Sequence, residues 1–171
     1  ANVAAQIVRL VHIYGITNLK IAAEMFVLNR QHVWQICNHL IDMKLGDKLN
    51  IWGYARIDTV KDTQLLDHMR KAGIKDLGIG IESASLRVRN SIEKGKFRDD
   101  DILAAVKRVN AAGIHVGANF IFGLPSDTLE SMKETADLCT EINAPYSNLY
   151  CAQAYPGSPL HSMAKEKGWG L

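Results

Sequence analysis

The sequence lacks several features that would each have indicated a class of protein. No apolar run in the 171 residues approaches the ~20 residues of a membrane-spanning helix, and no signal-peptide pattern opens the chain. The net charge of +2 comes from lysine and arginine scattered among acidic residues, so neither a nucleic-acid partner nor a membrane surface is predicted. No glycine-rich phosphate loop is present, and the histidines form no close pair, which argues against a phosphate-loop nucleotide site and a zinc site.

Cysteine is also scarce. Cys37, Cys139 and Cys151 are odd in number and far apart in the sequence, which argues against a disulfide framework and gives no short metal-ligand spacing. We therefore expect three buried structural thiols, no metal ligands among them, and a protein of the reducing cytoplasm.

What the sequence does contain is a recurring order of amphipathic helix, glycine and short apolar strand. Strands are expected at 18–23, 50–57, 75–83, 114–122 and 146–155. Their alternation with helical stripes predicts right-handed βαβ units, and hence an α/β fold with a parallel sheet and outer helices. Five strands are too few for a closed eight-stranded barrel of about 250 residues. The pattern therefore indicates either a small open sheet or part of a larger barrel.

The stretch 75–83 gives the first indication of a ligand site. As a strand it places large apolar residues on one face and Gly78, Gly80 and Glu82 on the other. The glycine face leaves volume that a ligand could fill beside a carboxylate, at the end of a parallel strand where α/β barrels bind ligands. The alternative is a buried strand whose glycines allow close packing, with Glu82 capping the next helix.

Other polar residues are predicted at the carboxyl ends of the strands. By alternation, Glu24, Arg56 and Asn119 share a face with Glu82. An amide inside an apolar barrel costs a few kcal/mol unless it is hydrogen-bonded, so Asn119 requires a partner from a ligand, a neighbouring backbone group or water. The loop 123–128 is interpreted as a tight turn, with Asp127 or Thr128 capping the following helix.

Together these segments resemble the radical S-adenosylmethionine (SAM) enzymes, in particular the class with a cobalamin-binding domain. Five motifs occur in family order with family spacing and cover nearly the whole chain: Ile21–Asn29, Tyr54–Thr59, Leu77–Ser83, Gly117–Pro125 and Tyr150–Ser158. Each motif alone is weak, whereas the ordered set is strong. The resemblance implies a partial (β/α)6 TIM-like barrel. Residues 1–171 would form one incomplete radical SAM core domain with about strands two to six, and without the first strand and the cluster loop.

The resemblance also implies a SAM site inside the barrel. It assigns Glu24 to the methionyl amino group, and Glu82 with Ser83 to the ribose and methionyl end. The fifth-strand segment 119–125 would flank adenine, with the backbone of the sixth strand beside it, and Lys94 would reach the carboxylate. The implied cofactor-binding residues are Glu24, Arg56, Glu82, Ser83, Lys94, Asn119, Phe122, Gly123, Ala154 and Tyr155.

In this family a [4Fe–4S] cluster binds SAM and cleaves it reductively to a 5′-deoxyadenosyl radical that abstracts hydrogen. The resemblance implies a small-molecule substrate and a reductant protein such as flavodoxin or ferredoxin. It leaves radical methyl transfer, ring formation and rearrangement open, with cobalamin in a separate upstream domain. The family's three-cysteine cluster motif would lie upstream of this chain, so no metal ligand is expected here and the chain alone is expected to be inactive. An acidic residue usual in the family is replaced by Ala23.

Two other functions fit the residues. The first is a TIM-like or open-sheet enzyme without redox chemistry that uses a carboxylate such as Glu82 as acid or base. The second is a non-catalytic module that keeps only a SAM pocket. A three-cysteine loop upstream of Glu24 would favour the radical enzyme over both.

Overall fold

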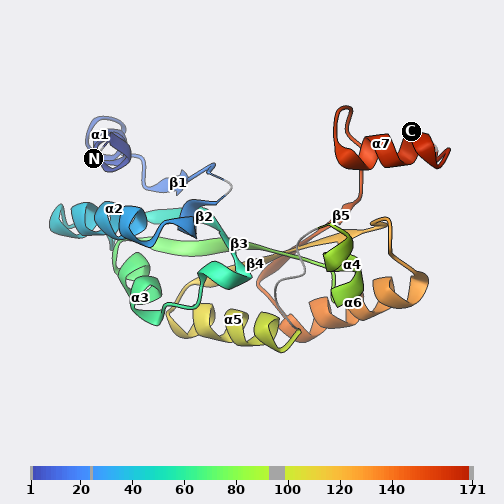
Figure 1. Cartoon of the computed structure of the whole chain (residues 1–171). Coiled ribbons are helices and arrows are strands. Elements are labelled where there is room, and N and C mark those ends of the chain that lie inside the picture. The colour runs from blue at the N-terminus through green and yellow to red at the C-terminus, as the bar shows by residue number, and fades with distance from the viewer. Residues whose placement is uncertain (1, 24, 93–98, 170–171) are drawn as a thin grey trace.

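The computed structural model describes residues 2–23, 25–92 and 99–169. Five strands form one parallel sheet in the spatial order β1-β2-β3-β4-β5, which is also their order in the chain. The sheet curves into a half-barrel with helices outside it (Figure 1), which confirms the predicted partial TIM-like barrel. The strands are β1 Asn18–Lys20, β2 Asn50–Arg56, β3 Ile74–Glu82, β4 His115–Phe122 and β5 Tyr146–Cys151.

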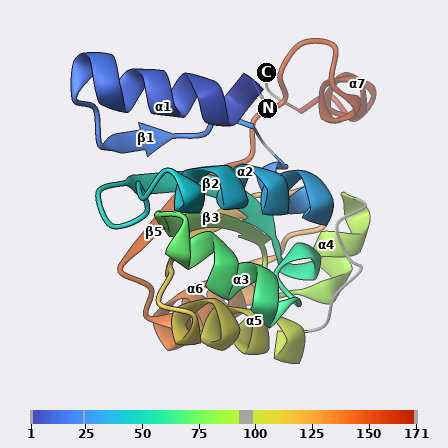
Figure 2. The same ribbon diagram turned by 90° about the vertical axis from the view of Figure 1, so that its left-hand side faces the viewer.

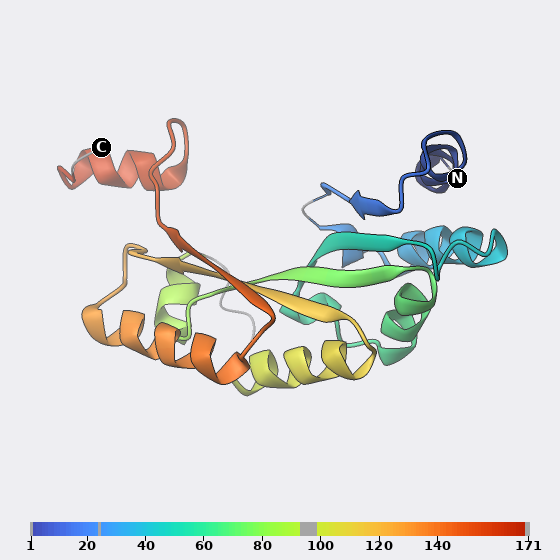
Figure 3. The same ribbon diagram turned by 180° about the vertical axis from the view of Figure 1, so that it is seen from behind.

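The helices lie mainly on one side of the sheet. Figures 1 and 3 show α3, α5 and α6 along this face, and α1 and α7 at opposite ends of the molecule. Helix α1 packs against α2, and its Ile7 belongs to the same buried cluster as the residues beneath the other outer helices. Figure 2 shows α2 continuing this outer layer, where it packs against α3, and α3 in turn packs against α5. The α-helices are α1 Asn2–Tyr14, α2 Arg30–Asp42, α3 Thr63–Lys71, α4 Leu86–Ser91, α5 Asp99–Ala111, α6 Leu129–Ile142 and α7 Pro159–Glu166, and the 3-10 helices are η1 Phe26–Leu28 and η2 Ile57–Thr59.

Local sequence explains where the helices begin and end. The Asn29 side chain accepts a hydrogen bond from the His32 backbone at 2.9 Å, and Asp62 accepts one from Leu65 at 3.0 Å, so each caps the first turn of its helix. Gly73, just after α3, has a φ of 95°. A glycine adopts this left-handed backbone without the steric cost of a Cβ, which ends the helix and turns the chain into β3.

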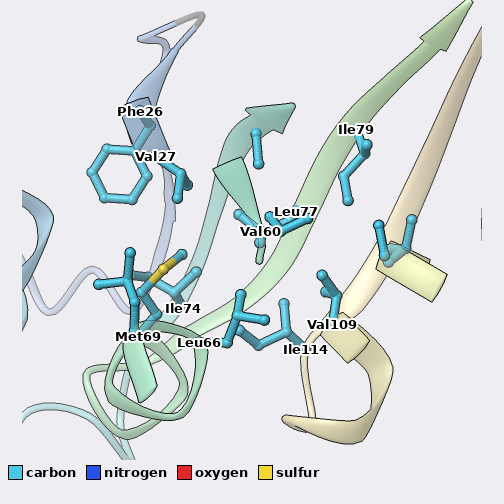
Figure 4. Close-up of a cluster of buried hydrophobic side chains, with 14 of the residues drawn as sticks. Phe26, Val27, Val60, Leu66, Met69, Ile74, Leu77, Ile79, Val109 and Ile114 are labelled. Carbon is cyan, nitrogen blue, oxygen red and sulfur yellow. The ribbon is translucent and has the colours of Figure 1, made fainter. Parts of the chain in front are cut away.

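The core lies between the sheet and the outer helices. Apolar residues alternate along β3 and β4, and those on the helix-facing side are fully buried. Burial of one such side chain contributes about 1.5–3 kcal/mol, so this face supplies most of the stability of the half-barrel. Figure 4 shows the cluster, which includes Phe26, Val27, Val60, Leu66, Met69, Ile74, Leu77, Ile79, Val109 and Ile114.

Three local predictions were wrong. The last strand was expected over 146–155, but β5 ends at Cys151. The first strand was expected over 18–23, but β1 ends at Lys20, and beyond it the Ile21 N–H still donates to the Trp52 carbonyl at 2.8 Å. This strand pairs only with β2, so its last residues form backbone hydrogen bonds on one side only and are less strongly held in the sheet. The three thiols were expected to be buried, but only Cys37 is. Cys139 is half-buried, and Cys151 is exposed because it ends the edge strand β5, whose last three residues are all exposed.

Candidate functional site

Three rows of side chains cross the sheet on the face opposite the core. Aligned residues of neighbouring parallel strands point to the same side, so the strand register defines each row. The upper row is the one closest to the carboxyl ends of the strands. The lower row is Lys20, Trp52, Asp76 and His115; the glycine row is Tyr54, Gly78, Gly117 and Tyr146; and the upper row is Arg56, Gly80, Asn119 and Asn148.

Aromatic side chains fill the space above the glycine row. A Cβ at Gly78 would lie 2.6 Å from the Trp52 ring, and a Cβ at Gly117 would collide with the Tyr146 ring. The two rings lean over the glycines from either side and meet, and the Trp52 Nε1–H donates a hydrogen bond to the Tyr146 hydroxyl. The ligand volume expected at Gly78 is therefore absent, and the alternative of close packing holds there, because Gly78 and Gly117 make room for aromatic side chains of the same sheet.

Further contacts close this lower part of the inner face. The Tyr54 ring meets Trp52 edge to face at a centroid distance of 4.3 Å, and the Lys20 ammonium lies 4.6 Å above the Trp52 ring, within cation–π range. Burial raises the pKa of Tyr146, although the Trp52 hydrogen bond opposes this rise, so its hydroxyl is neutral at physiological pH. An aromatic floor of Trp52, Tyr54 and Tyr146 thus lies beneath the upper row.

The upper row differs from the glycine row because its glycine, Gly80, is surrounded by polar side chains and not by aromatic rings. Among the described residues, a Cβ at Gly80 would meet only the Glu82 carboxylate, whose Oε1 would be 2.8 Å away. The Asn148 side-chain Nδ2 donates to the Asn119 side-chain Oδ1 at 2.8 Å, and the Asn119 Nδ2 donates to the Ile79 backbone carbonyl at 3.4 Å. The partners of Asn119 are thus a backbone group, as one alternative predicted, and Asn148, which the sequence analysis missed. The alternation of Tyr146 and Asn148 along the last strand could have indicated it.

Glu82 ends β3 in an unusual backbone conformation. Its φ is 69°, and the Ser83 N–H donates to the Ile81 carbonyl at 2.9 Å, which closes a three-residue turn around it. The side chain is 6% exposed, and its carboxylate lies over Gly80. The predicted common face of Gly80 and Glu82 is confirmed, although the strand register shifts between these two residues.

The side chain of Ser83, the next residue, lies on the other side of the sheet from the Glu82 carboxylate. Ser83 is fully buried, and its hydroxyl lies 3.1 Å from that of Thr135 in α6, away from the upper row. Arg56 does lie in the upper row, where Asp58 holds its guanidinium through two contacts of 3.0 Å. Both side chains of this pair are partly exposed, so it is a modest ionic contact that leaves part of the guanidinium open to solvent.

The segment after β4 forms a tight loop at the same end of the sheet. Gly123 has a φ of 79°, and no described atom lies within 4 Å of the position of its missing Cβ. The Asp127 carboxylate accepts hydrogen bonds from the backbone of Gly123 at 2.9 Å and of Leu124 at 3.1 Å. Thr128 caps α6, which confirms one of the two predicted caps.

The other predicted site residues that the structure describes do not join the upper row. Phe122 packs against the core on the helix-facing side. Ala154 and Tyr155 follow β5, and Tyr155 is 68% exposed. Glu24 and Lys94 lie outside the described residues. The structure therefore aligns Arg56, Gly80 and Asn119, with the Glu82 carboxylate over Gly80, and it turns the side chains of Ser83 and Phe122 elsewhere. Gly123 lies in the loop that follows β4.

The cysteines of this chain do not fit an iron–sulfur cluster. Cys37, Cys139 and Cys151 lie on α2, α6 and β5, and within residues 2–23, 25–92 and 99–169 no three metal-ligating side chains come together. Burial raises the pKa of the Cys37 thiol to about 12, so this group is protonated rather than a thiolate ligand.

In the same described part of the chain, no helix is both long and apolar enough to cross a bilayer.

Comparison with known proteins gives consistent results. Residues 7–139 match the model of the radical SAM superfamily. The chain is 27% identical over 151 residues to an uncharacterized methyltransferase of Pyrococcus horikoshii, covering 88% of this chain and 32% of that protein. It is 28% identical over 172 residues to the anaerobic magnesium-protoporphyrin IX monomethyl ester cyclase of Cereibacter sphaeroides, covering 97% of this chain and 27% of that protein.

A solved structure has the same fold. The chain is similar to the radical SAM methyltransferase TsrM of Kitasatospora setae, whose structure contains cobalamin and a [4Fe–4S] cluster, with a TM-score of 0.80. The similarity covers 98% of this chain and 31% of that one, at 15% sequence identity. The chain thus spans about a third or less of the length of the relatives it matches.

Proposed function

The chain belongs to the radical SAM superfamily, and from this premise we propose that its half-barrel binds SAM along the upper row. The family match and the fold bear out the resemblance drawn from the sequence motifs. Membership alone does not say which residues of this chain contact the cofactor, so the proposal depends on the geometry of the inner face.

The observation that carries the proposal is the contrast between neighbouring glycines. Gly78 and Gly117 are covered by aromatic rings, whereas the space at Gly80 is bounded by the Glu82 carboxylate. SAM carries a methionyl ammonium, a sulfonium and ribose hydroxyls, which are positive or hydrogen-bond donors and therefore suit a carboxylate. Mostly apolar sites with a few well-placed polar groups are typical of cofactor binding.

The polar residues of the upper row and the Glu82 carboxylate beside it then each have a proposed role. Glu82 receives the ribose and methionyl end, and the Asn119–Asn148 amide pair lies where adenine binds, beside the backbone of Gly123. Arg56, whose charge Asp58 partly balances, is placed to meet the methionyl carboxylate. The aromatic floor occupies the space above Gly78 and Gly117, so the proposed ligand is confined to the upper row.

The whole protein is proposed to be a radical SAM enzyme that acts on a small molecule. A [4Fe–4S] cluster would supply the electron that cleaves SAM and so starts the radical reaction. The described cysteines do not fit this cluster, so its ligands are assigned to another part of the protein. A reductant protein such as flavodoxin or ferredoxin would reduce the cluster again after each electron transfer. Three free thiols support a reducing, cytoplasmic setting.

Radical methyl transfer is the proposed reaction. Its support is that a methyltransferase is among the curated relatives and that TsrM is a methyltransferase of the same fold. Cobalamin would then be held by a separate domain. Product analysis of the full-length enzyme, supplied with methyl-labelled SAM, would show label in the product if this proposal holds.

Calorimetric titration of the full-length protein with SAM tests the binding site. We expect Glu82→Gln to weaken SAM binding by about 1–3 kcal/mol, the scale of a lost charge-assisted hydrogen bond. Glu130→Gln is the matched control, because Glu130 is an exposed carboxylate in the first turn of α6. Equal SAM affinity in folded Glu82→Gln and Glu130→Gln would refute the site.

A further inference from the structure

The buried polar residues of the described chain gather at one place. Side chains of this kind are found at the end of β3 and on helices α4 and α6, and they are Glu82, Ser83, Arg89, Ser131 and Thr135. Burial of a polar group is unfavourable unless its hydrogen bonds are satisfied, so a cluster of this kind has a structural or functional reason. It lies directly behind the proposed SAM site.

A chain of hydroxyl groups joins the end of β3 to α6. The Thr135 hydroxyl donates to the Ser131 carbonyl at 2.8 Å and accepts from the Ala84 N–H at 3.0 Å. A hydroxyl has one proton, so the 3.1 Å contact between Ser83 and Thr135 must be donated by Ser83. The Ser83 oxygen in turn accepts from the Ser85 N–H at 3.1 Å. The direction of every bond in the chain is thereby set.

Arg89 holds the same segment from the opposite side. Its Nη1 donates to the Ser83 carbonyl at 2.7 Å and to the Ala84 carbonyl at 2.6 Å. Arg89 is fully buried in α4, so these charge-assisted bonds are shielded from water. Residues 83 and 84 are thus bonded through their N–H, carbonyl and side-chain groups to two helices.

These contacts begin at the residue after Glu82, whose backbone is strained. A φ of 69° is uncommon for a residue other than glycine, and the three-residue turn around Glu82 is of a rare type. Such a conformation persists only where the surroundings hold it in place. The bonds from Thr135 and Arg89 supply that restraint, and the turn in turn sets the Glu82 carboxylate over Gly80.

Helix α6 also holds the loop after β4. The Ser131 hydroxyl donates to Asp127 at 2.7 Å, and Asp127 accepts from the backbone of Gly123 and Leu124. The same helix therefore contacts both strand ends that carry the proposed site, through Thr135 for β3 and through Ser131 for β4.

From these contacts we infer that Ser83, Thr135 and Arg89 form a polar clamp of positioning residues, which holds the Glu82 carboxylate in the orientation that binds SAM. This inference rests on the proposed SAM site. The clamp residues lie behind the site and act through Glu82 rather than by touching the ligand themselves.

The test is SAM titration of the full-length protein carrying Thr135→Val, which keeps the shape of the side chain and removes the hydroxyl. We expect SAM affinity to fall about tenfold, the effect of one misplaced hydrogen bond to a charged group. Thr140→Val is the matched control, since Thr140 lies on the same helix and makes the same bond, to the Ala136 carbonyl at 3.0 Å, but on the exposed side. We expect it to bind SAM as the wild type does.

Two further variants separate positioning from general packing. Thr135→Ser restores the hydroxyl and is expected to restore affinity. In a Glu82→Gln background, Thr135→Val is expected to weaken binding no further, because residues that act through one contact are not additive. Should Thr135→Val fail to fold, Ser83→Ala removes the donating hydroxyl of the same chain and carries the same expectations.

The outcomes distinguish this inference from the proposal beneath it. Weak binding by Glu82→Gln together with normal binding by Thr135→Val overturns the clamp and leaves the SAM site standing. Additive losses in the double variant also overturn it. Normal binding by Glu82→Gln itself overturns the assignment of Glu82 and, with it, the role of the clamp.

Discussion

The glycine row and the upper row lie next to each other on the same face and differ in what occupies the space above their glycines. Gly78 and Gly117 are covered by Trp52 and Tyr146, which form a bonded aromatic pair. Gly80, two residues further along β3, faces a carboxylate. A glycine on the inner face of a parallel sheet therefore has two distinct uses, and its position along the strand decides between them.

The comparison shows how a partial barrel can limit the depth of its ligand site. Aromatic rings that lean over glycines fill the lower interior with groups from the same sheet, at no cost in strand pairing. The polar groups then start where the rings end. Substitutions at the three glycines are the most direct way to break this comparison, and they are best made in the full-length protein.

The largest loss of stability is expected from Gly117→Ala. The added methyl group would collide with the Tyr146 ring, which cannot move away without losing its bond to Trp52. Overpacking of this kind costs about 1–3 kcal/mol, and we expect a value near the upper end. Thermal unfolding measures the loss. An unchanged melting temperature would show that the ring is free to shift.

A smaller loss is expected from Gly78→Ala, about 1–2 kcal/mol, because its Cβ would meet the outer edge of the Trp52 ring. Trp52→Phe shortens that ring. The double variant should therefore recover part of the stability lost by Gly78→Ala when both are compared with Trp52→Phe alone. If the double variant is no better, the loss comes from the backbone and not from the ring.

Gly80→Ala should separate stability from binding. Alanine suits a strand better than glycine does, and the new Cβ meets only the flexible end of Glu82 among the described residues, so the melting temperature should change little. Displacement of the carboxylate should weaken SAM binding about tenfold, or ~1.4 kcal/mol. A fall in melting temperature like that of Gly78→Ala would remove the distinction between the two rows.

The smallest effect is expected from Tyr146→Phe, which removes the acceptor of the Trp52 hydrogen bond and should cost about 1 kcal/mol. The cost should depend on pH. The folded-state pKa of Tyr146 is raised mainly by burial, so the stability linked to it is complete below the ordinary value of about 10 and is lost as pH rises through the folded-state value. Wild-type stability should thus fall more steeply than that of Tyr146→Phe above this pH, as measured by denaturant titration.

Hydrophobic alternation predicted the sheet, the covered face and the common face of Gly80, Glu82 and Asn119, because each of these depends on the period of a strand. It could not predict that Trp52 and Tyr146 fill the glycine row, since their meeting depends on strand register and on the curvature of the sheet. The assignment of Ser83 to the same ligand site as Glu82 came from the family resemblance and not from alternation, since successive residues of a strand point to opposite faces. The Ser83 hydroxyl instead contacts Thr135 of α6 on the helix-facing side, and alternation could not predict the left-handed turn at Glu82 that precedes it.

The left-handed backbone at Glu82 also restricts how this position can change during evolution. Asparagine, aspartate and glycine accept a positive φ readily, whereas a β-branched residue is strongly disfavoured there. A lineage that gave up the carboxylate while keeping the fold would therefore be expected to carry asparagine or glycine at this position rather than valine or isoleucine. In a distant relative, asparagine or glycine at this position would indicate a barrel that keeps the turn but has lost its ligand. Valine or isoleucine would indicate a β3 that ends in a different turn.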